Sequence, residues 1–93
     1  MVIGLLAFEI FLPYSHSLKD KRKVLNTLRD RVRSRFNAAF AELDFQDKWQ
    51  RSTIGIVTLN SQKGFVDEVL QKICRDVEEN LEGEIVRTEL HYF

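Results

Sequence analysis

Apolar residues follow one another almost without interruption along residues 2–12, which predicts a central β-strand buried on both faces. Pro13 is expected to end this strand, because proline has no N–H to donate to a sheet. Ser17 then predicts a helix N-cap, with Asp20 in the position of a capping-box carboxylate. A helix reaching Asn37 follows from apolar residues at helical spacing, namely Leu18, Leu25, Leu28, Val32 and Phe36.

Two further strands are predicted in the middle of the chain. Residues 37–45 alternate between apolar and polar positions toward their end, and residues 52–60 are rich in β-branched side chains. The polar run at 46–50 predicts a turn, so the two strands are expected to form a hairpin.

A second helix and a fourth strand complete the pattern. Asn60 or Ser61 is expected to cap the helix and Gly83 to close it. Residues 84–93 alternate as a last strand. The apolar stripe of the helix consists of Phe65, Val66, Val69, Leu70, Ile73, Val77 and Leu81.

The predicted order βαββαβ indicates one α+β domain over residues 1–93 with a ferredoxin-like fold. Right-handed crossovers give an antiparallel sheet in the order 4-1-3-2 with both helices on one face. The other face is left open and is too apolar to face water, so we expect a homodimer through it. Its expected residues are Ile3, Leu5, Ala7, Glu9, Phe11, Ala38, Phe40, Glu42, Asp44, Ile54, Ile56, Ile85, Arg87, Glu89 and His91.

Composition narrows the class of protein. A chain of 93 residues with 44% hydrophobic and 30% charged residues is typical of one small globular domain. The single cysteine, Cys74, excludes an internal disulfide and fits a reducing compartment. The apolar start lacks the basic region and cleavage site of a signal peptide, and it is shorter than the ~20 residues needed to span a bilayer. We therefore expect a cytoplasmic protein with no membrane partner.

Charge is unevenly distributed along a chain of formal net charge zero. Residues 17–36 hold eight of the fourteen basic residues and only two acids, whereas residues 64–93 hold eight acids and three bases. In the predicted first helix, Arg22, Arg29 and Arg33 share one exposed stripe about 16 Å long, enough to follow several phosphates. An acidic protein partner and a simply solvated helix face are the alternatives.

The loop before this helix and the hairpin turn hold further candidate residues. His16 lies beside two serines at the helix N-terminus, where backbone N–H groups can hold an anion. Trp49 can stack on a base or, more commonly, pack over Pro13 or Tyr14. An enzyme centred on His16, Asp44 and Asp47 is a third, weaker hypothesis.

Motifs for catalysis and metal binding are absent from the sequence. No phosphate-binding P-loop, GxGxxG, CxxC or HExxH occurs. Four acids of the open sheet face are candidates to converge on a cation, but their spacing matches no metal motif, and pairing with Arg51 and Arg87 is the favoured alternative. These acids are Glu9, Glu42, Asp44 and Glu89. We therefore expect no catalytic residue, metal or cofactor.

The blocks SLKDKR and DFQDKWQR, with SHS, RFN and GIV around them, make the chain resemble the bacterial YlxP-like family, catalogued as domain of unknown function 503. The resemblance implies a ferredoxin-like fold but no established activity. Genes of this family commonly lie among genes for transcription elongation, translation initiation and ribosome maturation factors, which implies a role near ribosomal RNA. The matching positions are Ser17, Leu18, Lys19, Lys21, Arg22, Asp44, Gln46, Asp47, Trp49 and Arg51. Asn26, Thr27 and Phe45 depart from the expected basic or polar character.

The sequence thus predicts a small cytoplasmic accessory protein that binds RNA, near the ribosome or its maturation, through its basic helix. The expected RNA contacts are Lys19, Lys21, Arg22, Arg29, Arg33, Trp49 and Arg51. The other motif positions of this surface are His16, Ser17, Asp44, Gln46 and Asp47. The alternative is a homodimeric protein-interaction module whose basic helix docks an acidic protein without RNA.

Overall fold

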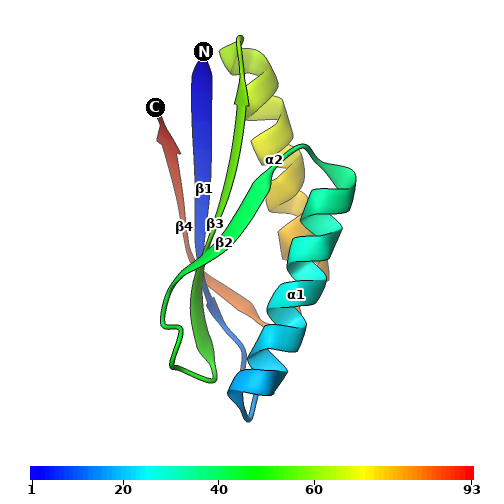
Figure 1. The fold of residues 1–93 in the computed structure, drawn as a ribbon, viewed down its shortest axis with the longest axis vertical. Coiled ribbons are helices and arrows are strands. Elements are labelled where there is room, and N and C mark those ends of the chain that lie inside the picture. The colour runs from blue at the N-terminus through cyan, green and yellow to red at the C-terminus, as the bar shows by residue number, and fades with distance from the viewer.

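Four strands and two helices follow one another as βαββαβ in the computed structural model, which describes all 93 residues (Figure 1). All strand pairs are antiparallel, and the sheet order β2-β3-β1-β4 is the predicted 4-1-3-2 order, so the predicted ferredoxin-like fold is confirmed. The elements are β1 (Val2–Phe11), α1 (Leu18–Arg35), β2 (Ala39–Asp44), β3 (Arg51–Asn60), α2 (Lys63–Asn80) and β4 (Glu84–Tyr92).

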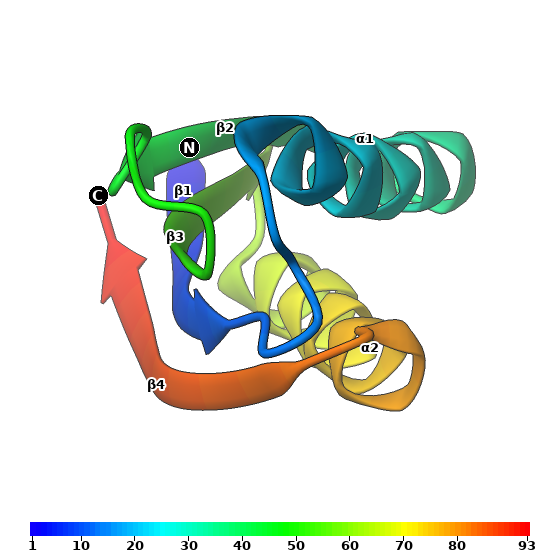
Figure 2. The same ribbon diagram turned by 90° about the horizontal axis from the view of Figure 1, so that it is seen from below.

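Both helices cover the same face of the sheet, with α1 beside β2 and α2 on the other flank (Figure 2). The core between helices and sheet consists of 13 buried apolar residues, to which β1 contributes alternate positions such as Phe8 and Ile10, both 0% exposed. Gly4 lies where α2 crosses β1, and a Cβ there would come within 2.6 Å of Leu70 and Val66. The absence of a side chain at this position therefore lets α2 lie close to the sheet. Neither helix is long and apolar enough to cross a membrane.

The predicted start of α1 is confirmed. The Ser17 hydroxyl accepts a hydrogen bond of 3.0 Å from the Asp20 N–H, and the Asp20 carboxylate accepts one of 2.9 Å from the His16 N–H. The second bond reaches one residue further back than in a standard capping box. The helix ends at Arg35, where the Phe36 N–H still bonds to the Val32 carbonyl.

The boundaries of α2 differ from the prediction. Its N-cap is Gln62, whose side chain makes no capping bond, although the Asn60 side chain accepts a hydrogen bond of 3.0 Å from the Gln62 N–H. The helix ends at Asn80, so Gly83 does not close it. Gly83 instead lies against β1, where a Cβ would meet the Phe11 carbonyl oxygen at 2.6 Å.

The predicted open face is right for β1 and wrong for parts of the other strands. Ile54 and Ile56 are 0% exposed and belong to the core, and their partners in β2, Glu42 and Phe40, therefore lie on the helix side. Ile85 packs on the core as well, as does Ala38 just before β2. Asp44 faces outward as predicted, opposite Thr53, and the other outward residues of β2 and β3 are Ala39, Ala41, Leu43, Arg51, Thr53, Gly55, Val57 and Leu59.

Candidate nucleic-acid interface

Lys21 is buried, so the prediction that it contacts RNA is wrong. Only 1% of its side chain is exposed, and its ammonium group pairs with the Glu42 carboxylate at 3.0 Å. The same Nζ donates to three backbone carbonyls of the β2–β3 hairpin, those of Phe45 at 2.7 Å and of Gln46 and Arg51 at 3.3 Å each. No donor of Lys21 is left for a phosphate.

The Lys21–Glu42 pair connects the first turn of α1 to the hairpin. The Ser52 hydroxyl, buried beside the pair, donates a hydrogen bond of 2.7 Å to Glu42. Phe45 adopts a φ of 62°, a left-handed conformation that is uncommon for a bulky residue. The carbonyl groups of Phe45 and Gln46 both accept hydrogen bonds from the Lys21 ammonium group. This strained turn is therefore part of the contact that holds the hairpin to α1.

The flank of α1 that faces α2 has both of its arginines paired. Arg31 and Arg35 both bind Asp76 of α2, with N–O distances of 2.9 Å and 3.5 Å. Asp76 is 9% exposed, and the Asn80 amide donates to its carbonyl group at 2.8 Å. These two arginines therefore fasten one helix to the other.

The opposite flank of α1 carries the remaining basic residues except Lys23, which lines the groove toward α2, and we call it the arginine flank. Lys19, Arg22 and Arg33 are exposed and form no ion pair, and Arg29 pairs only with its neighbour Asp30 at 3.0 Å. From Arg22 to Arg33 the helix rises about 16 Å. The arginine flank consists of Lys19, Arg22, Asn26, Arg29 and Arg33.

Trp49 and Arg51 do not lie on the arginine flank. Arg51 is on the open face of the sheet, where its guanidinium pairs with Glu9 at 3.4 Å and lies 4.0 Å from the centre of the Phe45 ring. Trp49 is 56% exposed and lines a shallow hollow of about 420 Å³ beside Phe11 and Arg51. The structure therefore divides the predicted RNA contacts between two sides of the molecule.

The other motif positions have structural roles or remain free. Ser17 caps α1, and the Gln46 carbonyl accepts from Lys21. Asp44 accepts a hydrogen bond of 2.7 Å from the next backbone N–H. The exposed side chains of His16 and Asp47 make no hydrogen bond to one another or to Asp44, so the residues of the weaker enzyme hypothesis do not form a catalytic array.

The four acids considered for a cation do not converge. Glu42 lies on the helix side with Lys21, while Glu9 and Glu89 lie on the open face paired with Arg51 and Arg87 respectively. No group of three or more potential ligands is close enough to hold a metal ion.

Cys74 lies half-buried on α2. Partial burial, reinforced by the Glu78 carboxylate at 3.3 Å, raises the pKa of its thiol to about 11. At neutral pH the group is therefore a protonated thiol and not a nucleophile.

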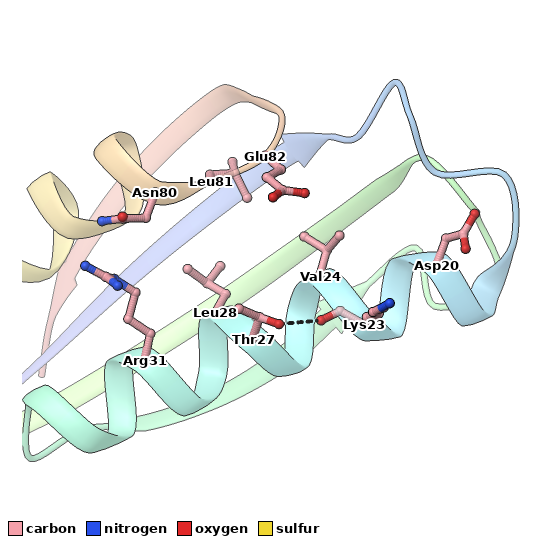
Figure 3. A pocket seen from close by; sticks show the side chains of 9 residues that line it. All are labelled: Asp20, Lys23, Val24, Thr27, Leu28, Arg31, Asn80, Leu81 and Glu82. Carbon is pink, nitrogen blue, oxygen red and sulfur yellow. Dashed lines mark hydrogen bonds between the residues drawn. The ribbon is translucent and has the colours of Figure 1, made fainter.

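A groove of about 580 Å³ runs between α1 and the end of α2 (Figure 3). Val24, Leu28 and Leu81 supply its apolar lining, and Arg31 points across it toward Asn80. The Thr27 hydroxyl is already bonded to the Lys23 carbonyl at 3.0 Å. The groove lies on the α2 side of α1, away from the arginine flank, and no buried polar side chain lacks a partner there.

The sequence does contain one signal for the burial of Lys21, its spacing from the neighbouring leucines. Leu18, Lys21 and Leu25 are three and four residues apart, which places the lysine in the middle of the apolar stripe. Its partner Glu42 sits 21 positions further along the chain, so no local pattern connects the two.

This arrangement of two helices on a four-stranded antiparallel sheet defines a ferredoxin-like α+β domain. A de novo designed protein with ferredoxin fold, LFR1 1, superposes with a TM-score of 0.51 at 10% identity, over 100% of this chain and 83% of the designed one. A second designed protein, Ferredog-Diesel, gives a TM-score of 0.48 at 14% identity, over 98% and 83% of the two chains.

The family is shown by sequence. The profile described as "Protein of unknown function (DUF503)" matches residues 3–90, and the chain belongs to this family. The uncharacterized protein YlxP of Bacillus subtilis (strain 168) is 33% identical over 90 residues, which cover 95% of this chain and 98% of that protein.

Proposed function

We propose that the protein is a small cytoplasmic RNA-binding accessory protein, acting near the ribosome or its maturation, and that the arginine flank of α1 is its RNA surface. The supporting observation is the division of the basic residues of α1 into two groups. Lys21, Arg31 and Arg35 are held by buried or half-buried acids. The remaining cations are exposed or, for Arg29, half-buried, and none has a partner from another element of the fold.

The chemistry of this surface fits a phosphate backbone. Arginine donates two parallel hydrogen bonds to a phosphate group, and exposed arginines can turn toward a ligand without breaking structural ion pairs. Binding would be mainly electrostatic, because the surface consists of cationic and polar side chains and contains no aromatic residue of its own. Trp49, which lies elsewhere, is not part of the proposed surface.

The ribosomal assignment has a different support, the gene neighbourhood that the family resemblance implies. A structured ribosomal RNA fragment and purified ribosomal subunits are therefore the ligands to test first. Tighter binding to subunits than to an unrelated hairpin RNA is the expected result, and equal binding to both would contradict the ribosomal part of the proposal.

The RNA surface is tested by replacing Arg22, Arg29 and Arg33 with glutamine together and measuring fluorescence anisotropy of a labelled RNA. Loss of three phosphate contacts is expected to weaken binding at least tenfold at low salt, an order-of-magnitude figure. The matched control replaces Lys63, Lys72 and Arg75 of α2 with glutamine, which changes the net charge equally but away from α1. Equal weakening by the two variants would contradict the proposed surface.

A second candidate function is docking of α1 on an acidic protein. Asn26 and Asp30 interrupt the basic surface, and a mixed surface of this kind suits specific pairs with a folded partner. Nuclease treatment of complexes isolated from cells separates the two functions. A complex that survives digestion and is lost in the triple arginine variant favours the protein partner, whereas release by nuclease favours RNA.

A further inference from the structure

We propose that the sheet face opposite the helices is the interface of a homodimer, in which two copies of the chain pack sheet against sheet. This inference is independent of the proposed RNA surface. The face runs across all four strands and has no element of the fold over it (Figure 2).

The face is apolar over most of its length. None of its apolar side chains belongs to the core cluster or packs against it, so their burial needs another molecule. Leu43, Leu59 and Phe93 are 49%, 60% and 72% exposed. The apolar residues of the face are Ile3, Leu5, Ala7, Phe11, Ala39, Ala41, Leu43, Val57, Leu59 and Phe93.

Both arginines of the face are already paired. Glu9 pairs with Arg51 at 3.4 Å, and Glu89 pairs with Arg87 at 2.6 Å. Asp44, opposite Thr53, and Glu84, opposite Phe11, lie on the same face, which thus carries four acids and two arginines, and no free positive charge for RNA or for an acidic protein. A face with charges of both signs can pair with its own copy, as an isologous interface requires.

The size of the face also suits a second copy. Four strands about 4.8 Å apart and about nine residues long give a flat area of roughly 550 Å². Side-chain relief increases the accessible area above this value, toward the roughly 800 Å² per partner of a standard stable interface. With the sheets in contact, both α1 helices lie on the outside of the dimer, so the arginine flanks stay exposed (Figure 2).

The competing arrangement joins two copies edge to edge along β4. Val86 and Leu90 on this edge strand are 59% and 48% exposed, and an antiparallel pairing centred on Thr88 would place each opposite the other. The two arrangements use different residues and are therefore separable by substitution.

Sedimentation equilibrium of the full chain and of two matched variants tests the proposal. L59E places a carboxylate in the sheet face of both protomers, and we expect at least a hundredfold weaker dimer, an order-of-magnitude figure. L90E makes the same charge change on the β4 edge strand, where Leu90 is 48% exposed and pairs with the core residue Leu6 on the helix side of the sheet. Its dimer constant is expected to stay within about threefold of that of the unsubstituted chain.

Three results would overturn the proposal. They are a monomer for the unsubstituted chain at about 100 µM, an L59E dimer as tight as that of the original chain, or dissociation by L90E alone. Far-UV circular dichroism checks that each variant is folded. Should L59E fail to fold, F93D carries the same test, because only the backbone of Phe93 is bonded to β1 and its side chain is exposed.

Discussion

A lysine ammonium group surrounded by three backbone carbonyls and one carboxylate joins α1 to the β2–β3 hairpin. Lys21 is almost completely buried, whereas the side chain of Glu42 is 22% exposed. A buried charge is tolerated only when its hydrogen bonds are satisfied, and here each of the three ammonium protons has an acceptor nearby. Lys21 therefore contributes to the stability of the hairpin and not to ligand binding.

Replacing Lys21 with methionine is expected to lower the free energy of unfolding by about 3 kcal/mol, because it leaves Glu42 and three carbonyls without their donor. Urea denaturation followed by circular dichroism measures this change. The control is Lys19→Met, at an exposed position two residues away, with an expected effect within about 0.5 kcal/mol. Equal effects of the two substitutions would contradict the structural role of Lys21.

At the scale of elements, both helices and all four strands were predicted from the sequence, because their signals are local. The heptad-like recurrence of leucines marks α1, and Ser17 followed by Asp20 marks its first turn. Boundaries were less accurate at α2, where Gln62 is the N-cap without a side-chain bond. The first residue of α2 therefore could not be located from a capping residue in the sequence.

The assignment of faces within the sheet depended on contacts that a local pattern does not contain. Glu42 was expected to point outward as a charged residue, but it points inward because Lys21 neutralises it. A bulge beyond Glu42 also shifts the register of β2 on β3. In β3 both alternating sets are apolar, so only the position of the helices decides that Ile54 and Ile56 face inward.

The N-cap of α1 gives a prediction at the same scale. Ser17→Ala removes the acceptor of the Asp20 N–H and is expected to lower the free energy of unfolding by about 1 kcal/mol. Ser34→Ala, on the exposed surface of the same helix, is the control, with an expected effect within about 0.5 kcal/mol because alanine is the better helix former. Urea denaturation of both variants provides the comparison.

For the molecule as a whole, the sequence predicted some of the RNA-contact residues on the wrong side of the fold. The sequence placed the basic helix, Trp49 and Arg51 at one edge, whereas the structure puts Arg51 on the open face and the arginine flank on the helix layer. The chain therefore has two unoccupied surfaces of different chemistry. One is basic and suited to phosphate, and the other is largely apolar, has both of its arginines paired, and is suited to a second copy.

The most direct test of the account is the affinity for a structured ribosomal RNA fragment, measured across a salt series. Release of counterions by the arginine flank predicts a linear fall of log affinity with log salt, with a slope of about −2 to −4. The triple arginine variant should have a slope shallower by about two or more units, and the Lys63, Lys72 and Arg75 variant should keep the original slope. No binding at low salt, or an unchanged slope in the triple arginine variant, would contradict RNA binding through α1.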